Sequence, residues 1–367
     1  MPAKIDDKLL NRCANDPEGP VALHLCQHLV PVEGHGAPFF PPTFATDEKY
    51  NIDELMDGTR VALVDSVGAQ ANRMEPLFLR DPFRSLVPQV WIKYGDAESG
   101  TDGEVSLLEA GHRLGDAVIR CTELRDDAHA AFEALRRHDA GPIAKIAPTS
   151  LVFGAWDSRD TNAKVPRLVQ STIRAWNVSR LRRAAQFNPA LDYAAVGIYE
   201  DEDSLDKSTK DNLTQRGFIH VPSTDQPGGI VAHGPIRRDV TVNLVALRRL
   251  DSKEDSEALR RYLLGLTLLA ATQPIDPFLR QGCLLVPDAD QPADWTLVDR
   301  NGTRTTVSIN ADGLLAWARS AAKAFGVGED RDLTFDPKLG RADASTGNAK
   351  KASKKKAKKA TGKKSGK

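Results

Sequence analysis

Alternation of apolar and polar residues is the clearest pattern along the chain, and it predicts a protein of mixed strands and helices. A period of two predicts strands at residues 21–32 and 169–178, and an apolar run predicts one at 60–67. Residues 217–222 and 236–250 also suggest strands. The last two are joined by a glycine-rich loop. Residues 86–94 and 150–156 are also strand-like, and Asn301-Gly302 predicts a hairpin over residues 295–309.

Helical spacing of apolar residues predicts three further regions. Residues 256–273 form the clearest helix, because they are rich in leucine and alanine and Pro274 follows them. Residues 111–138 fit a helix or a broken pair, and residues 312–325 fit a final helix. Residues 200–216 have almost no apolar content, so we expect an exposed, mobile insertion there.

The composition is that of an ordinary soluble protein. It has 367 residues, of which 41% are hydrophobic and 27% charged. The four cysteines are widely spaced without a CxxC pair, which is typical of a reducing compartment. We see no signal pattern and no apolar run of membrane-spanning length, so we expect a cytoplasmic location and no membrane contact.

The net charge of +0 conceals two differently charged parts. Residues 350–367 contain ten lysines and no acid, so the remainder has 40 basic residues against 50 acidic ones. An acidic body disfavours indiscriminate nucleic-acid binding, so any such site must be a local basic stripe. The lysine tail fits either a nucleic-acid arm or a solubilising end.

The most basic internal stretch is residues 151–183. It has seven basic residues against two acids, and it includes Trp156 and Trp176. Cations interleaved with flat rings suit a surface that holds phosphates and stacks bases. The alternative is a solvated basic face beside two core tryptophans. Strand alternation places Arg174 and Trp176 on the same face.

A polar cluster follows the predicted strand at residues 60–67, where a helix is expected to begin after Ser66. Free backbone N–H groups at such a corner bind an anion, or the polar side chains simply cap the helix. The cluster consists of Asp65, Ser66, Gln70, Asn72 and Arg73.

The sequence predicts no cofactor. Neither phosphate-binding glycine motif is present, so nucleotide hydrolysis is unsupported. His24, Cys26 and His28 share one strand face, but no second ligand cluster has metal spacing, so zinc is disfavoured.

Three blocks of sequence, residues 62–76, 150–178 and 228–248, together resemble one family. With FFPPTF ahead of them and LLGLTLLAATQP behind, they are similar to the backbone subunit of type I-G (formerly I-U) CRISPR effectors. This is the Csb/GSU family, a Cas-seven-like branch of the RAMP superfamily. The resemblance spans about residues 21–325, and the lysine tail lies outside it.

The resemblance implies an α+β fold, with an RRM-like (ferredoxin-like) palm and large insertions that include a β-hairpin thumb. We divide the chain into an N-terminal extension (1–20), the palm with inserted finger and thumb segments (21–330), and a disordered lysine-rich tail (331–367).

The family binds a CRISPR guide RNA, stacks head to tail along it, and presents the spacer for pairing with target DNA. The implied partners are the guide RNA, target DNA, neighbouring copies, a large subunit, a fused five/six-type subunit and a helicase-nuclease.

A variable spacer requires contacts to phosphates and 2′-hydroxyls, not to base edges, and arginine suits this role. The alternative for each residue is a surface ion pair with the abundant acids. We expect guide contacts first from Arg159, Lys164, Arg167 and Arg174, and next from Asn72, Arg73, Arg237 and Arg238.

Two rival functions remain. The first is a RAMP-type endoribonuclease that processes guide precursor or cuts target RNA and uses Asp157, Asp160 or His233. Neither a His pair nor a two-carboxylate metal spacing supports this function. We therefore expect a non-catalytic subunit. The second is an RNA-binding protein unrelated to CRISPR whose lysine tail binds.

Overall fold

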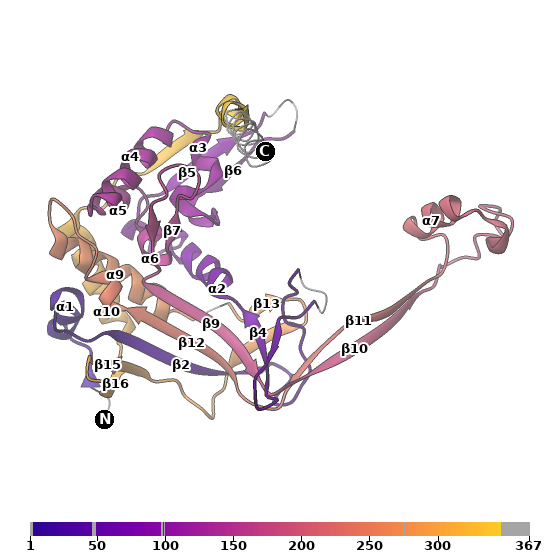
Figure 1. Cartoon of the computed structure of the whole chain (residues 1–367), viewed down its shortest axis with the longest axis horizontal. Coiled ribbons are helices and arrows are strands. Elements are labelled where there is room, and N and C mark those ends of the chain that lie inside the picture. Colours follow the sequence, from indigo (N-terminus) through magenta and orange to yellow (C-terminus); the bar gives the residue numbers. More distant parts are fainter. Residues whose placement is uncertain (1–2, 46–48, 97, 99, 275, 346–367) are drawn as a thin grey trace, which may run out of the picture.

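The computed structural model describes residues 3–45, 49–96, 98, 100–274 and 276–345. Its centre is a set of four strands: β2 (Ala22–Pro31), β9 (Val169–Trp176), β12 (Ile236–Asn243) and β15 (Trp295–Val298). Their order in the sheet is β9-β12-β2-β15, and each pairs antiparallel with its neighbour (Figure 1). Helices connect β2 to β9, a long hairpin connects β9 to β12, and further helices precede β15. This βαββαβ arrangement is ferredoxin-like, so the predicted α+β fold class is confirmed.

Further strands extend this sheet on both sides. β4 and β3 lie beyond β9, β16 and β1 lie beyond β15, and β14 pairs with both β2 and β13. The β15–β16 pair is the hairpin predicted at Asn301-Gly302. The bounds of these strands are β1 (Ala3–Lys4), β3 (Ile52–Glu54), β4 (Arg60–Asp65), β13 (Phe278–Arg280), β14 (Cys283–Pro287) and β16 (Arg304–Ser308).

The N-terminal residues take part in this sheet and its core. β1 pairs with β16, and α1 (Asp7–Asn15) follows it with Asp6 as its cap. Leu10 and Cys13 of α1 are buried in the main core. The segment that we set apart as an extension therefore packs against the palm.

Helices cover one face of the sheet and leave the other open. α9 (Ser256–Thr272) is buried along most of its length and packs on α10 (Ala311–Phe325). The two approach closely at Gly265, where a Cβ would lie 3.0 Å from that of Ala318. Along β12, buried and half-buried residues alternate. We call the side that the helices cover the covered face and the opposite side the open face.

The chain between β4 and β9 builds a largely helical region. The predicted broken pair at residues 111–138 is confirmed, and the strand predicted at residues 86–94 begins at Val90. The helices are α2 (Val67–Met74), α3 (Ala117–Arg120), α4 (Arg125–Arg136), α5 (Gly141–Ile146) and α6 (Pro148–Phe153), with short 3-10 turns between them. A separate sheet contains β5 (Val90–Tyr94), β6 (Gly103–Ser106) and β17 (Arg331–Thr334).

The strand predicted over residues 150–156 is wrong. The segment begins in α6, which has Pro148 in its first turn and ends before Gly154 at φ 82°. Every residue of α6 is buried, so its apolar run carried no period that distinguishes helix from strand. Only β7 (Ala155–Trp156) is extended, and it pairs with β8 (Lys164–Val165).

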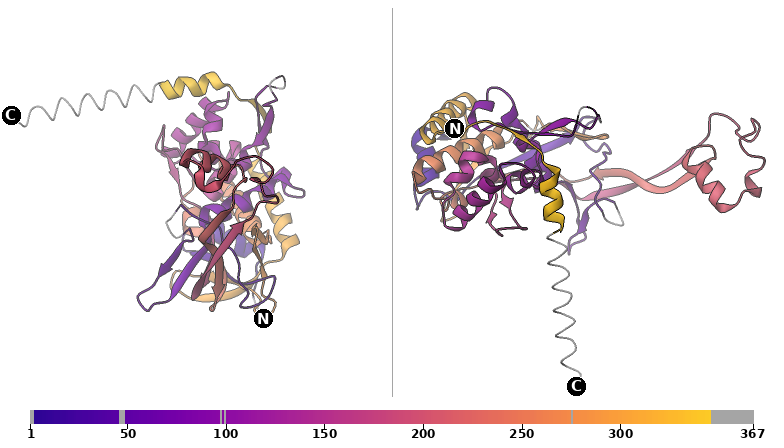
Figure 2. Two further views of the ribbon diagram at one scale, coloured as in Figure 1. Left: turned by 90° about the vertical axis from the view of Figure 1, so that its right-hand side faces the viewer. Right: turned by 90° about the horizontal axis from the view of Figure 1, so that it is seen from above.

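A long hairpin projects from the sheet, in keeping with the expected thumb (Figure 1, Figure 2). Its strands are β10 (Val178–Phe187) and β11 (Val221–Ala232), and α7 (Lys207–Gln215) lies at its far end. The glycines that we assigned to a loop between strands lie inside β11 instead, next to a register shift. The insertion predicted at residues 200–216 is exposed, but it contains α7, whose cap is Asp206.

The C-terminal segment begins with a strand on the separate sheet. Residues 331–334 form β17, parallel to β5, whereas the ten tail lysines lie outside the described residues. None of the helices in the described part of the chain combines the length and apolarity needed to cross a bilayer.

Candidate nucleic-acid interface

Two adjacent arginines of β12 lie on opposite faces of the sheet. Arg238 is only 2% exposed and faces α2, whereas the side chain of Arg237 is 34% exposed on the open face. This follows from strand geometry, since successive side chains point to opposite sides. Only one of the two is therefore available to a ligand on the open face.

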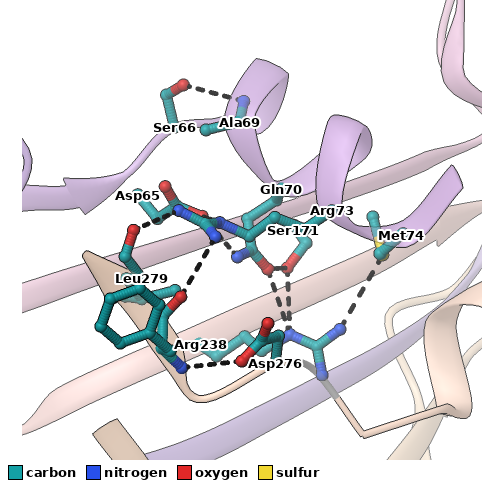
Figure 3. Close-up of polar contacts among 11 residues, drawn as sticks. Asp65, Ser66, Ala69, Gln70, Arg73, Met74, Ser171, Arg238, Asp276 and Leu279 are labelled. Atoms are coloured by element: carbon teal, nitrogen blue, oxygen red, sulfur yellow. Dashed lines mark hydrogen bonds and ion pairs between the residues drawn. The ribbon is translucent and has the colours of Figure 1, made fainter. Parts of the chain in front are cut away.

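Arg238 is held by neutral partners beneath α2 (Figure 3). Its Nε lies 3.3 Å from Gln70 Oε1 and 3.2 Å from Ser171 Oγ. Gln70 Nε2 in turn donates to Asp65 Oδ2 at 2.6 Å. Burial lowers the pKa of Arg238 to about 10, so it stays charged near neutral pH. The prediction that Arg238 contacts guide RNA is therefore wrong, because the side chain is enclosed.

The strand-to-helix corner is a structural cluster. Ser66 Oγ accepts from Ala69 N at 3.2 Å and caps α2. Arg73 Nε donates to Asp65 at 3.0 Å, and its Nη2 donates to Leu279 O at 2.8 Å (Figure 3). Asn72 Oδ1 accepts from Arg113 at 3.4 Å. Of the two interpretations left open by the sequence, the structure supports capping and internal pairing.

The open face carries a cluster of cations around one aromatic ring, which we call the open-face cluster: Arg174, Arg237 and Trp176. Arg174 and Arg237 are direct partners across β9 and β12, and His28 of β2 is the next partner of Arg237. The guanidinium of Arg237 lies 5.4 Å from the ring centroid of Trp176, within cation–π range.

The open-face cluster has little negative charge to balance it. Arg174 Nη1 donates to Thr172 Oγ1 at 2.8 Å, and Arg237 reaches Asp239 at 3.5 Å. Of the two neighbouring guanidiniums, Arg237 is paired with a carboxylate and Arg174 with a neutral hydroxyl, so an additional anion is electrostatically favoured. The hairpin strand β10 begins two residues after Trp176, so the cluster lies at the root of the hairpin.

The remaining predicted residues lie outside this face. Lys164 and Arg167 line a separate pocket together with Trp156. Arg159 is exposed in the loop between β7 and β8. Sequence reasoning missed Arg113, which is buried and pairs with Glu75 at 2.7 Å. No sequence pattern marks this pair, because its partners lie in different elements and meet only in the fold.

Of the residues considered for nuclease activity, Asp157 and Asp160 line one small pocket, whereas His233 lies elsewhere. Asp157 accepts from Thr161 N at 2.8 Å and from Arg120 at 2.6 Å. Burial alone would raise the pKa of Asp157, but these hydrogen bonds and the Arg120 charge lower it below its ordinary value. Asp160 contacts His129 at 2.8 Å, whereas His233 contacts Ser179 at 3.0 Å and lines another pocket.

No metal centre emerges from the described ranges, in which we find no group of three or more His, Cys, Asp or Glu side chains placed to hold an ion.

The fold and the open-face cluster together define a class: an α+β protein whose antiparallel sheet presents arginine and an aromatic ring, as in sheets that bind single-stranded RNA. Residues 23–180, which include β2, β4, α2 and β9, match the family described as CRISPR-associated protein GSU0053. This match confirms, for that part of the chain, the resemblance to a CRISPR-associated family.

No curated protein matches the sequence significantly. Among solved structures, the chain is similar to one titled "CRISPR RNA-guided surveillance complex, pre-nicking". The identity is 13% and the TM-score 0.35, over 83% of this chain and 85% of that chain. The fold assignment therefore depends on the strand order of the molecule itself.

Proposed function

We propose that this protein is the guide-RNA-binding backbone subunit of a type I-G CRISPR effector complex. Copies stack head to tail along the guide RNA and present its spacer for pairing with target DNA. The other effector subunits and a helicase-nuclease complete the assembly. The observation that carries the proposal is the open-face cluster on a ferredoxin-like sheet, within a chain that matches a CRISPR-associated family.

The chemistry of the open-face cluster suits an RNA whose sequence varies. Guanidinium groups hold phosphates in any sequence, and an indole stacks on any base. Discrimination between targets is then left to base pairing. Head-to-tail contact does not close into a ring, so the length of the RNA sets the number of copies.

The double variant Arg174→Ala/Arg237→Ala tests this assignment. Each lost phosphate contact lowers the slope of log affinity against log salt by about 0.7 for a single strand, so a decrease of about 1.4 is expected. The measurement is guide-RNA binding by fluorescence anisotropy at several salt concentrations. Arg304→Ala is the control. Arg304 is exposed on β16, which is separated from β12 in the sheet by β15 and β2. An unchanged slope in the double variant would refute the assignment.

We further propose that the subunit is not a nuclease. The support is that Asp157 and Asp160 are bound to internal partners and that His233 lies in a different pocket. Labelled guide precursor and target RNA should remain intact with and without magnesium. Cleavage that disappears in His233→Ala or Asp157→Asn would overturn this.

A further inference from the structure

A second basic site occupies a pocket of 330 Å³ beside the β7–β8 pair. Its walls come from the 3-10 turn at Arg113, the end of α6, and both short strands. The described residues that line the pocket include no carboxylate, although the body of the protein is acidic overall. The charged and aromatic residues of the lining are His112, Arg113, Trp156, Lys164 and Arg167.

The two arginines of this pocket differ in their charge balance. Arg113 pairs with Glu75 at 2.7 Å, and its Nη1 donates to Gly154 O at 3.2 Å. Arg167 has no such partner: its Nε is buried and makes no hydrogen bond within the described residues. Burial and the neighbouring charge of Arg113 lower the pKa of Arg167. An anion in the pocket would relieve both effects, because it supplies an acceptor and a negative charge.

A flat ring lies beside these cations. Trp156 is 58% exposed, which is unusual for the largest apolar side chain. Its cross-strand partner Lys164 places Nζ 5.6 Å from the ring centroid. Gly154 makes this geometry possible, since its φ is 82° and a Cβ there would lie 2.9 Å from Arg167 Cγ. The pocket therefore combines an unbalanced cation with an accessible stacking surface.

We infer that this pocket binds one nucleotide of single-stranded RNA, with its phosphate at Arg167 and Lys164 and its base against Trp156. The inference depends on the proposed function and adds a second contact site to it. A simple anion would account for the cations alone. A nucleotide accounts for the cations and for the exposed indole together.

Binding of adenosine 5′-monophosphate and of inorganic phosphate to the full chain, measured by calorimetry, tests the inference. Trp156→Ala should weaken nucleotide binding about tenfold and leave phosphate binding unchanged, because stacking involves only the base. Arg167→Ala should weaken both. The matched controls are Phe278→Ala, which removes a ring that is 56% exposed, and Arg304→Ala. Nucleotide binding no tighter than phosphate binding, or unaltered in Trp156→Ala, would overturn the inference.

RNA affinity separates failure of the inference from failure of the proposed function. If Trp156→Ala and the double variant Arg174→Ala/Arg237→Ala both weaken RNA binding, both proposals stand. If only the double variant weakens it, the pocket inference is wrong. If the unaltered chain does not bind guide RNA, while nucleotide binding still requires Trp156, the guide-binding function is wrong and the pocket remains a nucleotide site.

Discussion

Arg237 and Arg238 are the same residue type at adjacent positions, yet the fold uses them in opposite ways. Arg237 lies over an aromatic ring on the open face, where a ligand can reach it. Arg238 lies under α2 and is bound to Gln70 and Ser171. A guanidinium is therefore not in itself evidence for a phosphate site. The side of the strand on which it lies decides whether its charge serves binding or packing.

The burial of Arg238 also shows how a charge is accommodated without an ion pair. Taking a cation out of water is costly unless hydrogen bonds replace its hydration. Here Gln70 Oε1 and Ser171 Oγ accept from it, and Gln70 connects it to the anion of Asp65. Arg73 completes the balance by pairing with the same carboxylate. Two cations and one anion are thus joined in one network on the covered face.

The largest effect is expected from a substitution on the covered face, where it should lower the stability of the fold. Arg238→Ala removes a large buried side chain together with the hydrogen bonds that Gln70 Oε1 and Ser171 Oγ accept from it. The free energy of unfolding should fall by about 3 kcal/mol, from the cavity and the lost hydrogen bonds together. Urea denaturation followed by circular dichroism measures it. A loss below about 1 kcal/mol would mean that Arg238 is not a packing residue.

Asp157 is a buried anion outside β12. Varying the pH tests whether hydrogen bonds to its charge stabilise the fold. Asp157→Asn should cost about 1–2 kcal/mol at neutral pH, because the charged hydrogen bonds from Thr161 and Arg120 weaken. Since the folded-state pKa of Asp157 lies below 3.8, its contribution is present above that pH and is lost as pH falls further. Unfolding curves of both proteins should therefore converge in acid. A difference that is independent of pH would contradict this origin.

A substitution on the open face should leave stability nearly unchanged and weaken RNA binding instead. Arg237→Ala should change the free energy of unfolding by about 0.5 kcal/mol or less, because its pair with Asp239 is partly exposed. Guide-RNA affinity should nevertheless decrease, most clearly at low salt. On the same preparation, urea denaturation gives the free energy of unfolding and fluorescence anisotropy gives the guide-RNA affinity. A large loss of stability in Arg237→Ala would remove the distinction between the two faces.

The smallest effect is expected at the C-terminus. Removing residues 346–367 takes away the ten tail lysines but keeps the 2.7 Å pair between Arg125 and Asp343. Guide-RNA affinity at physiological salt should change little, if the open-face cluster is the binding site. Loss of guide binding in this truncation would favour the alternative in which the tail alone binds RNA.

The periodic parts of the fold could be predicted from the sequence. β2, β12 and α9 follow the apolar pattern closely, and the Asn301-Gly302 turn located the β15–β16 hairpin. Prediction failed where burial is uniform, as in α6, because a segment buried on every side has no period of exposed residues. It also failed at α7, whose residues are all at least partly exposed and whose helix depends on its cap at Asp206.

For the open-face cluster, the sequence contained a pattern that our prediction did not use, namely the alternation of apolar residues along β12. Ile236, Val240 and Val242 mark the buried positions of β12, and Arg238 shares their parity. Alternation alone would thus have placed Arg238 inside and Arg237 outside. The proximity of Lys164, Arg167 and Arg113 had no such signal, because it depends on how α6 and the β7–β8 pair meet in the folded chain.

Gln70 has a consequence for how the molecule responds to acidity. Its amide is hydrogen-bonded to Asp65 at one end and to Arg238 at the other, and an amide gains or loses no proton in the range where proteins fold. The hydrogen-bonded link between Asp65 and Arg238 therefore passes through a group whose protonation is the same throughout that range. Near neutral pH the change in protonation falls instead on the buried carboxyl of Glu75, because burial raises its pKa to about 7.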